Sequence, residues 1–298
     1  MISSVSAAAR ARGISSRRWA GKEWLAVPAV VFLVAFLFVP ALLLALTSFW
    51  TTSYYQTTAD WNVAQYADLF SQSGVLRTLS RSIVTGLIAA SAATVLAIPV
   101  AVYLRFRQGR GRVVALGIIV TALFSSYLVR IYAWRTLLGR DGAVNWLLQS
   151  LDITSGPTLA LFYNRFAVVL TLVHIYLPFA VITLFSAFEA VEREVIDASR
   201  TLGSKSNQTA RWVILPLTAP GLFAAFAFTF ILSAGDYVTP QLVGGKSGAM
   251  IGQLISVEFL QTGDYSHGAA LSMIFVASVL VTLSAVYGLG RLVGRLQR

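Results

Sequence analysis

The chain has 298 residues, of which 57% are hydrophobic and only 12% are charged, and its mean hydropathy is +0.73. A soluble domain of this length cannot bury so much apolar surface, so the composition excludes a soluble globular protein and predicts an integral membrane protein. The formal net charge of +11 needs no nucleic-acid partner, because basic residues set membrane topology and meet anionic lipid. Because the chain has no cysteine, disulfides, thiol catalysis and cysteine metal sites are excluded.

Six apolar runs are long enough to cross a bilayer as helices, which takes about 20 residues. The sequence therefore predicts an all-α membrane protein with six transmembrane helices, at Leu25–Ser48, Ile83–Leu104, Val113–Leu138, Phe166–Phe188, Leu217–Ala234 and Gly268–Gly290. The first run follows a basic start, as in a signal peptide. At about 24 residues it is too long for a cleaved signal, so we interpret it as a retained anchor.

The basic residues predict the orientation of these helices. Sixteen of the 23 Lys and Arg residues fall in the amino-terminal head, the second and fourth connections and the tail, whereas five fall on the opposite side. Since basic connections remain in the cytoplasm, both termini are expected inside the cell. The chain then divides into a cytoplasmic head (1–23), a first anchor helix (24–50), an outside loop with a short helix (51–82), a core of five transmembrane helices (83–290) and a cytoplasmic tail (291–298).

The cytoplasmic connection at 189–216 is far longer than a link between two spans requires. Drawn as a helix from Val191 to Gly203, it gathers its apolar residues on one narrow stripe and its charged residues on the opposite face. The stripe consists of Val191, Val195, Ala198 and Leu202, and the charged face of Arg193, Asp197 and Arg200. Asp197 and Arg200, and Glu189 and Arg193, have the spacing of helical ion pairs.

Glycine and proline define the end of this segment. Gly203 offers the left-handed residue that stops a helix, and Pro216 and Pro220 suit the first turn of the next one. An amphipathic helix lying flat on the membrane is the alternative. Such helices are strongly basic and carry bulky apolar anchors, whereas this stripe is narrow and its polar face is also acidic. The pattern favours a helix that docks onto a cytoplasmic partner.

The stretch Asp197-Ala198-Ser199, followed by Gly203 and then by Val213-Ile214-Leu215-Pro216, resembles the Glu-Ala-Ala loop of ABC importer permeases. The spacing of the family pattern is kept, with Asp, Ser and Val in place of Glu, Ala and Ile. The resemblance implies a type I ABC importer permease fold whose cytoplasmic helix couples to a separate ATPase. The coupling residues that it implies are Val195, Asp197, Ala198, Ser199, Leu202, Gly203, Leu215 and Pro216.

Two further stretches, 126–134 and 235–245, are similar to the spermidine/putrescine-type branch of that family. The resemblance implies a non-catalytic permease subunit in the inner membrane that translocates a small cationic solute by alternating access. The implied partners are two ATP-binding cassette ATPase subunits, a second homologous permease, a solute-binding protein on the outside and membrane lipid. No cofactor is expected in this chain, because ATP and Mg would be bound by the ATPase.

Polar and aromatic residues of these two stretches are candidates for the substrate pathway: Tyr127, Arg130, Tyr132, Trp134, Asp236 and Tyr237. A membrane-embedded Arg130 needs a partner or a cavity, so it is either a pathway residue or a structural partner of Asp236. The aromatic rings could face an ammonium group or simply pack at the interface. A slight acidic excess outside favours a cationic solute, whereas Arg130 keeps a zwitterionic amino-acid derivative open as an alternative.

Three other classes of protein fit the sequence less well. Gly245-Lys246-Ser247 resembles the end of a phosphate-binding loop, but Pro240 stands where the first glycine is required, so the ATPase must be another chain. An ion-coupled secondary transporter would need acidic residues near the centre of a span, and the predicted spans have none there. An intramembrane enzyme would need clustered catalytic residues, which are also missing from the predicted spans.

Overall fold

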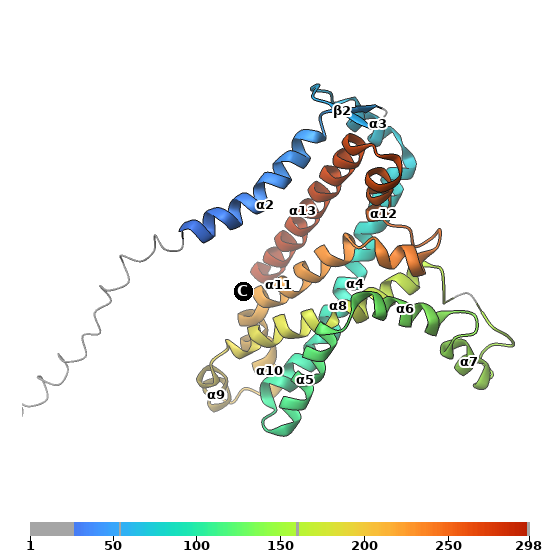
Figure 1. Ribbon diagram of the computed structural model, residues 1–298. Coiled ribbons are helices and arrows are strands. Elements are labelled where there is room, and N and C mark those ends of the chain that lie inside the picture. The colour runs from blue at the N-terminus through green and yellow to red at the C-terminus, as the bar shows by residue number, and fades with distance from the viewer. Residues whose placement is uncertain (1–26, 54, 159–160, 297–298) are drawn as a thin grey trace, which may run out of the picture.

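The computed structural model describes residues 27–53, 55–158 and 161–296, and it is built almost entirely from helices (Figure 1). The predicted basic head at 1–23 lies outside the described residues. The elements in chain order are α2 (Val27–Thr47), β1 (Thr51–Ser53), β2 (Gln56–Thr58), α3 (Ala64–Ser71), α4 (Ser73–Phe106), α5 (Arg110–Phe124), α6 (Tyr127–Leu138), α7 (Ala143–Ser150), α8 (Arg165–Glu189), α9 (Arg193–Thr201), α10 (Ser206–Thr209), the π-helical segment η3 (Ala210–Ile214), α11 (Leu215–Ala234), the π-helical segment η4 (Pro240–Gly244), α12 (Ile251–Val257), the π-helical segment η5 (Glu258–Thr262) and α13 (Tyr265–Leu296).

Among the described residues, five helical runs are long and apolar enough to cross a membrane, and a bent pair of helices makes a sixth candidate. Five of the six predicted spans therefore correspond to single helical runs. Three of these runs extend beyond the predictions: α4 begins already at Ser73, the fifth run begins at Ser206, and α13 continues through much of the predicted tail to Leu296. Their ends are more polar than their centres, which is why hydropathy alone placed the boundaries too far inward.

The third predicted span, Val113–Leu138, is broken rather than continuous. Helix α5 and the run Tyr127–Ser150, which begins with α6, are bent by 94° at a break between Phe124 and Tyr127. Ser125 there has extended backbone angles and Ser126 has non-helical ones, and the Ser125 hydroxyl donates to the Ala122 carbonyl at 2.9 Å. Serine side chains compete in this way for backbone groups and favour a helix end, a signal that hydropathy averages away.

Small residues let the three central helices α4, α8 and α11 pack closely. Along α4, residues at four-residue intervals form one fully buried face: Ala89, Ala93, Ala97 and Ala101. Without long side chains between them, helix backbones approach and gain van der Waals contact, which drives association inside a membrane. One such close approach is at Gly86, where a Cβ atom would lie 2.8 Å from the Cβ of Ala234 on α11.

The remaining elements surround this core. The hairpin β1–β2, α3 and α12 cover the end of the bundle where α13 begins (Figure 1), and the Thr52 and Ser266 hydroxyls are hydrogen-bonded there at 2.8 Å. Helix α2 leans away from the bundle, and none of its residues is buried. Because the helix is also strongly apolar, this exposure is what a helix in contact with lipid requires, as predicted for the anchor.

Replacing Gly86 by Ala is expected to lower the stability of the bundle. The added methyl group has no room beside Ala234, and such overpacking costs about 1–3 kcal/mol. Gly74→Ala on the same helix is the matched control, because nothing lies within 4 Å of its Cβ position. Thermal unfolding of the purified protein in detergent would measure the difference. Equal melting temperatures for the two variants would contradict the close contact between α4 and α11.

Candidate functional site

The cytoplasmic end of the bundle is organised by Arg105, in the last turn of α4. The side chain is buried, with 6% of the residue exposed. Its Nε donates to the Phe188 carbonyl at 2.9 Å and its Nη2 to the Val191 carbonyl at 2.8 Å. The last carbonyls of a helix have no partners within that helix. The Arg105 guanidinium therefore caps the end of α8 at Phe188, and it also binds Val191, which leads into α9.

Acidic Glu189, the last residue of α8, joins a second helix to this arrangement. Its carboxylate lies 3.8 Å from Arg105 Nη1 and 3.4 Å from Nη2 of Arg112 on α5. The predicted pairing of Glu189 with Arg193 is therefore replaced by contacts to α4 and α5. The helices α4, α5 and α8 converge at this point, which we name the Arg105 clamp: Arg105, Arg112, Glu189 and the carbonyls of Phe188 and Val191.

Helix α9 begins directly after the clamp. Most of the predicted coupling residues on and just after this helix are exposed on the surface of the protein. Leu202 is 86% exposed and Val195 is 39% exposed. Asp197 and Ala198 are exposed too, and the predicted ion pair between Asp197 and Arg200 is present at 3.9 Å. An exposed leucine beside a valine and an alanine is apolar surface that nothing in the described chain covers.

The predicted stripe is correct only in part, because the helix begins at Arg193 and not at Val191. Val191 is buried beneath the clamp, and the buried side chain of α9 itself is Ile196. The prediction placed Val191 on the apolar stripe because it treated Val191 to Gly203 as one unbroken helix. The structure turns it inward, so the outer apolar surface consists of Val195, Ala198 and Leu202.

The remaining predicted coupling residues fix the shape of the segment after α9. Gly203 has a φ of +86°, which confirms the predicted left-handed helix stop. The Ser199 hydroxyl lies 3.1 Å from the Thr209 hydroxyl and joins α9 to α10. Leu215 and Pro216 begin α11, after the π-helical segment η3. Pro216 cannot donate to the carbonyl four residues earlier, and this missing bond favours a widened helical turn.

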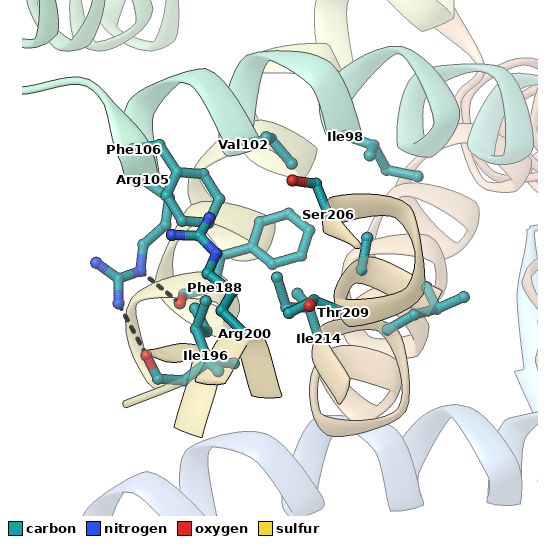
Figure 2. A pocket seen from close by; sticks show the side chains of 13 residues that line it. Ile98, Val102, Arg105, Phe106, Phe188, Ile196, Arg200, Ser206, Thr209 and Ile214 are labelled. Carbon is teal, nitrogen blue, oxygen red and sulfur yellow. Dashed lines mark hydrogen bonds between the residues drawn. The ribbon is translucent and has the colours of Figure 1, made fainter. Parts of the chain in front are cut away.

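A pocket of about 280 Å³ lies behind α9, between the cytoplasmic ends of α4, α8 and the run that leads into α11 (Figure 2). Its walls are mainly apolar and include Val102, Phe188 and Ile196, with Arg105 and Arg200 among the polar lining residues. The clamp is therefore one wall of this pocket, and α9 is another.

The second candidate region is a polar cluster centred on Asp236, at the turn that follows α11. The residue is 6% exposed, and both carboxylate oxygens lie 2.7 Å from the Tyr127 hydroxyl. The carboxylate also accepts hydrogen bonds from the Thr239 hydroxyl and from the backbone amides of Val238 and Thr239. This carboxylate ties the start of α6 to the turn before η4, and its acceptor positions are largely occupied by these donors.

Arg130 is not paired with Asp236, which was one of its two predicted roles. Its Nη1 donates to the Ile175 carbonyl on α8 at 3.0 Å, and its Nη2 lies 3.4 Å from the Ser125 carbonyl. Among the described residues, no acidic side chain forms an ion pair with it. The guanidinium therefore bridges the break in the third span to α8 and brings a positive charge beside the polar cluster.

The other predicted pathway residues are spread along the same region. Trp134 donates to His174 Nδ1 at 2.9 Å, whereas Tyr132 and Tyr237 are about half exposed. Sequence reasoning missed Tyr176, whose hydroxyl lies 3.4 Å from Asp236, and the buried Thr239. It also missed Arg105, although a charged residue just beyond the end of a predicted span was a usable signal.

Comparison with known proteins identifies the family. Residues 13–298 match the model of the binding-protein-dependent transport system inner membrane component. The chain belongs to this family. It is therefore an inner-membrane permease subunit of a binding-protein-dependent ABC importer, as the loop at 197–216 indicated.

Individual relatives agree with this assignment. The permease is 32% identical to the spermidine/putrescine transport system permease protein PotB of Escherichia coli, over 90% of this chain and 94% of that protein. It is also 32% identical to the E. coli inner membrane ABC transporter permease protein YdcU, over 72% of this chain and 71% of that protein. The PotB match extends over nearly the whole length of both proteins.

Solved structures support the fold. A bacterial alginate ABC transporter, crystallised in complex with a periplasmic protein that carries an alginate pentasaccharide, aligns with a TM-score of 0.72 at 16% identity. The alignment covers 93% of the permease and 98% of that chain. The MetNI methionine ABC transporter aligns with a TM-score of 0.56 at 18% identity, over 74% of the permease and 95% of that chain. At these identities the likeness shows the type I importer permease fold alone.

Replacing Arg105 by Gln is expected to loosen α9. The shorter amide cannot reach both the Phe188 and Val191 carbonyls, and each buried group left unpaired costs about 1–3 kcal/mol. Hydrogen exchange of the backbone amides at 189–203 should accelerate. Arg112→Gln is the control, because Arg105 keeps its carbonyl bonds in that variant. Equal protection of α9 in wild type and Arg105→Gln would rule out the clamp as its anchor.

Proposed function

We propose that this permease is driven by ATP through α9, which docks into a groove on a separate ATPase subunit. The observation that carries the proposal is the exposed apolar surface of Val195, Ala198 and Leu202, on a helix whose residues keep the spacing of a coupling loop. Leu202 is 86% exposed, so its side chain contributes little packing within this chain, but it is a suitable anchor for a protein interface. The acidic Asp197 at the edge of this surface would add specificity.

In this mechanism two ATPase subunits act on this permease and on a second, homologous permease across the pore. Closure of the ATPases would move α9 on each side and bias the spans between outward-open and inward-open packings. For such a two-state shift, the ligands must distinguish the two states by several kcal/mol, about 5.5 kcal/mol for nearly complete switching. A binding protein would deliver the solute at the outside face. No catalytic group of this chain takes part.

For the solute, we propose a small polyamine such as spermidine or putrescine. The 32% identity to PotB over 90% of the chain supports this assignment, because PotB is a spermidine/putrescine permease. The aromatic residues Tyr127, Tyr132, Trp134 and Tyr237 come from the two stretches that contain the polar cluster, and they could present ring faces to ammonium groups along the pathway. Asp236 would act there mainly by holding Tyr127 in place, since its oxygens already accept several hydrogen bonds.

A zwitterionic amino-acid derivative is the second candidate. The observation that favours it is Arg130, whose charge has no acidic partner among the described side chains and could attract a carboxylate. Ion-coupled secondary transport is the least supported alternative. The one buried acid of the polar cluster, Asp236, is held by several donors, which disfavours its use as a proton or sodium carrier.

Docking predicts that Leu202→Glu removes the ATPase from the purified complex. A buried charge without a partner would oppose the interface, whereas the exposed position leaves the permease fold intact. Asp197→Lys and Gly203→Asp should have the same effect, through charge reversal and through strain at positive φ. Thr201→Glu, at an exposed neighbouring position, is the control for added charge. Co-purification with a tagged permease measures the outcome, and full ATPase recovery with all three variants would refute the docking role.

The polyamine assignment predicts ATP-dependent uptake of labelled putrescine or spermidine. The assay uses vesicles that contain the full transporter, together with its binding protein. Excess unlabelled polyamine should compete, whereas a zwitterionic amino-acid derivative should not. If only the zwitterion is taken up or competes, the polyamine assignment is wrong and the ATP-driven mechanism stands. Uptake that follows an ion gradient and ignores ATP would overturn both.

A further inference from the structure

The pocket behind α9 crosses the expected boundary between membrane and cytoplasm. Ile98 and Val102 in its wall belong to the second predicted span, whereas Arg200 and Ser206 belong to the cytoplasmic connection. Figure 2 shows Arg105 and Arg200 on one side of the pocket and Ile98 on the other. A ligand that fits this arrangement must be apolar at one end and polar at the other.

The two ends of the pocket differ in chemistry. Toward the membrane, the lining consists of aliphatic and aromatic side chains such as Ile98, Val102 and Ile214. Toward the cytoplasm, the Arg200 side chain is 57% exposed, and the contact of its guanidinium with Asp197 is at the long distance of 3.9 Å. An exposed arginine with one weak contact keeps donors available for an anion, and a guanidinium matches phosphate geometry.

The surrounding charge favours an anion as well. The two cytoplasmic connections that border the pocket, 105–112 and 189–216, contain eight Lys and Arg residues against four Asp and Glu residues. The acid of the clamp, Glu189, is already shared by Arg105 and Arg112. The cytoplasmic leaflet is rich in anionic lipid, and basic pockets between membrane spans on that side bind anionic head groups.

We propose that this pocket binds an anionic phospholipid of the cytoplasmic leaflet. One acyl chain would lie along Ile98, Val102 and Ile214, and the phosphate would contact Arg200 at the mouth. The lipid would thus fill the space between α9 and the ends of α4 and α11. Its presence would stiffen the support behind the docking helix, so the coupling of the transporter would depend on the lipid composition of the leaflet.

The test uses the assembled transporter in nanodiscs that contain a trace of photoactivatable phosphatidylglycerol or phosphatidylcholine, each with a diazirine in the acyl chain. Peptides that cover 98–106 or 206–215 should be labelled preferentially by phosphatidylglycerol, roughly fivefold for one arginine contact. Arg200→Gln should remove most of this preference. Arg211→Gln deletes one charge from the same connection, outside the pocket lining, and should retain it.

A second variant tests the acyl-chain part of the site. Val102→Trp fills the apolar wall and should abolish labelling of both peptides by either lipid. Arg200→Gln, at an exposed position, keeps the test valid if the tryptophan variant fails to assemble. Equal labelling by the two lipids in wild type would overturn the proposal. So would labelling of the isolated permease that disappears in the assembled transporter, since a partner subunit would then occupy the pocket. Because labelling requires no transport, this result is independent of the solute.

Discussion

The buried guanidinium of Arg105 is the constraint on which the cytoplasmic half of the permease depends. An arginine removed from water must have its donors satisfied, and the Phe188 and Val191 carbonyls satisfy two of them. Those carbonyls belong to the end of α8 and the start of the connection, so the same bonds set the position at which α9 begins. The outward direction of Leu202, the inward direction of Ile196 and the pocket behind them follow from that starting point.

Arg105 can reach α8 only because the helices are close. The buried alanines of α4 remove the side-chain bulk that would otherwise separate it from its neighbours, and Gly86 allows still closer contact with α11. A membrane offers no hydrophobic drive for this association, so packing and polar contacts must supply it. The alanine face supplies the packing, and the clamp supplies polar contacts at the cytoplasmic end.

Much of the fold and part of the site could be predicted from the sequence, because those features depend on local patterns. Apolar runs gave the spans, and Gly203 and the Asp197–Arg200 pair follow from helix geometry within a few residues. The contacts of Arg105 with Val191, 86 positions away, and of Tyr127 with Asp236, 109 positions away, have no local signature. The break at Ser125 was missed for a different reason: two serines barely change the hydropathy of an apolar window.

One helix connects the two candidate regions. Near its middle, α8 carries the Ile175 carbonyl that binds Arg130 and the Tyr176 hydroxyl beside Asp236, and at its end it carries the Phe188 carbonyl held by Arg105. Phe188 lies thirteen positions after Ile175 on the same helix, a distance of about 20 Å along its axis. Pro178 lies between them and weakens the backbone bonds of that turn, which makes it a natural bending point. A displacement of α9 by a partner therefore has a direct structural route to the polar cluster, through a helix that can either shift as a unit or bend at Pro178.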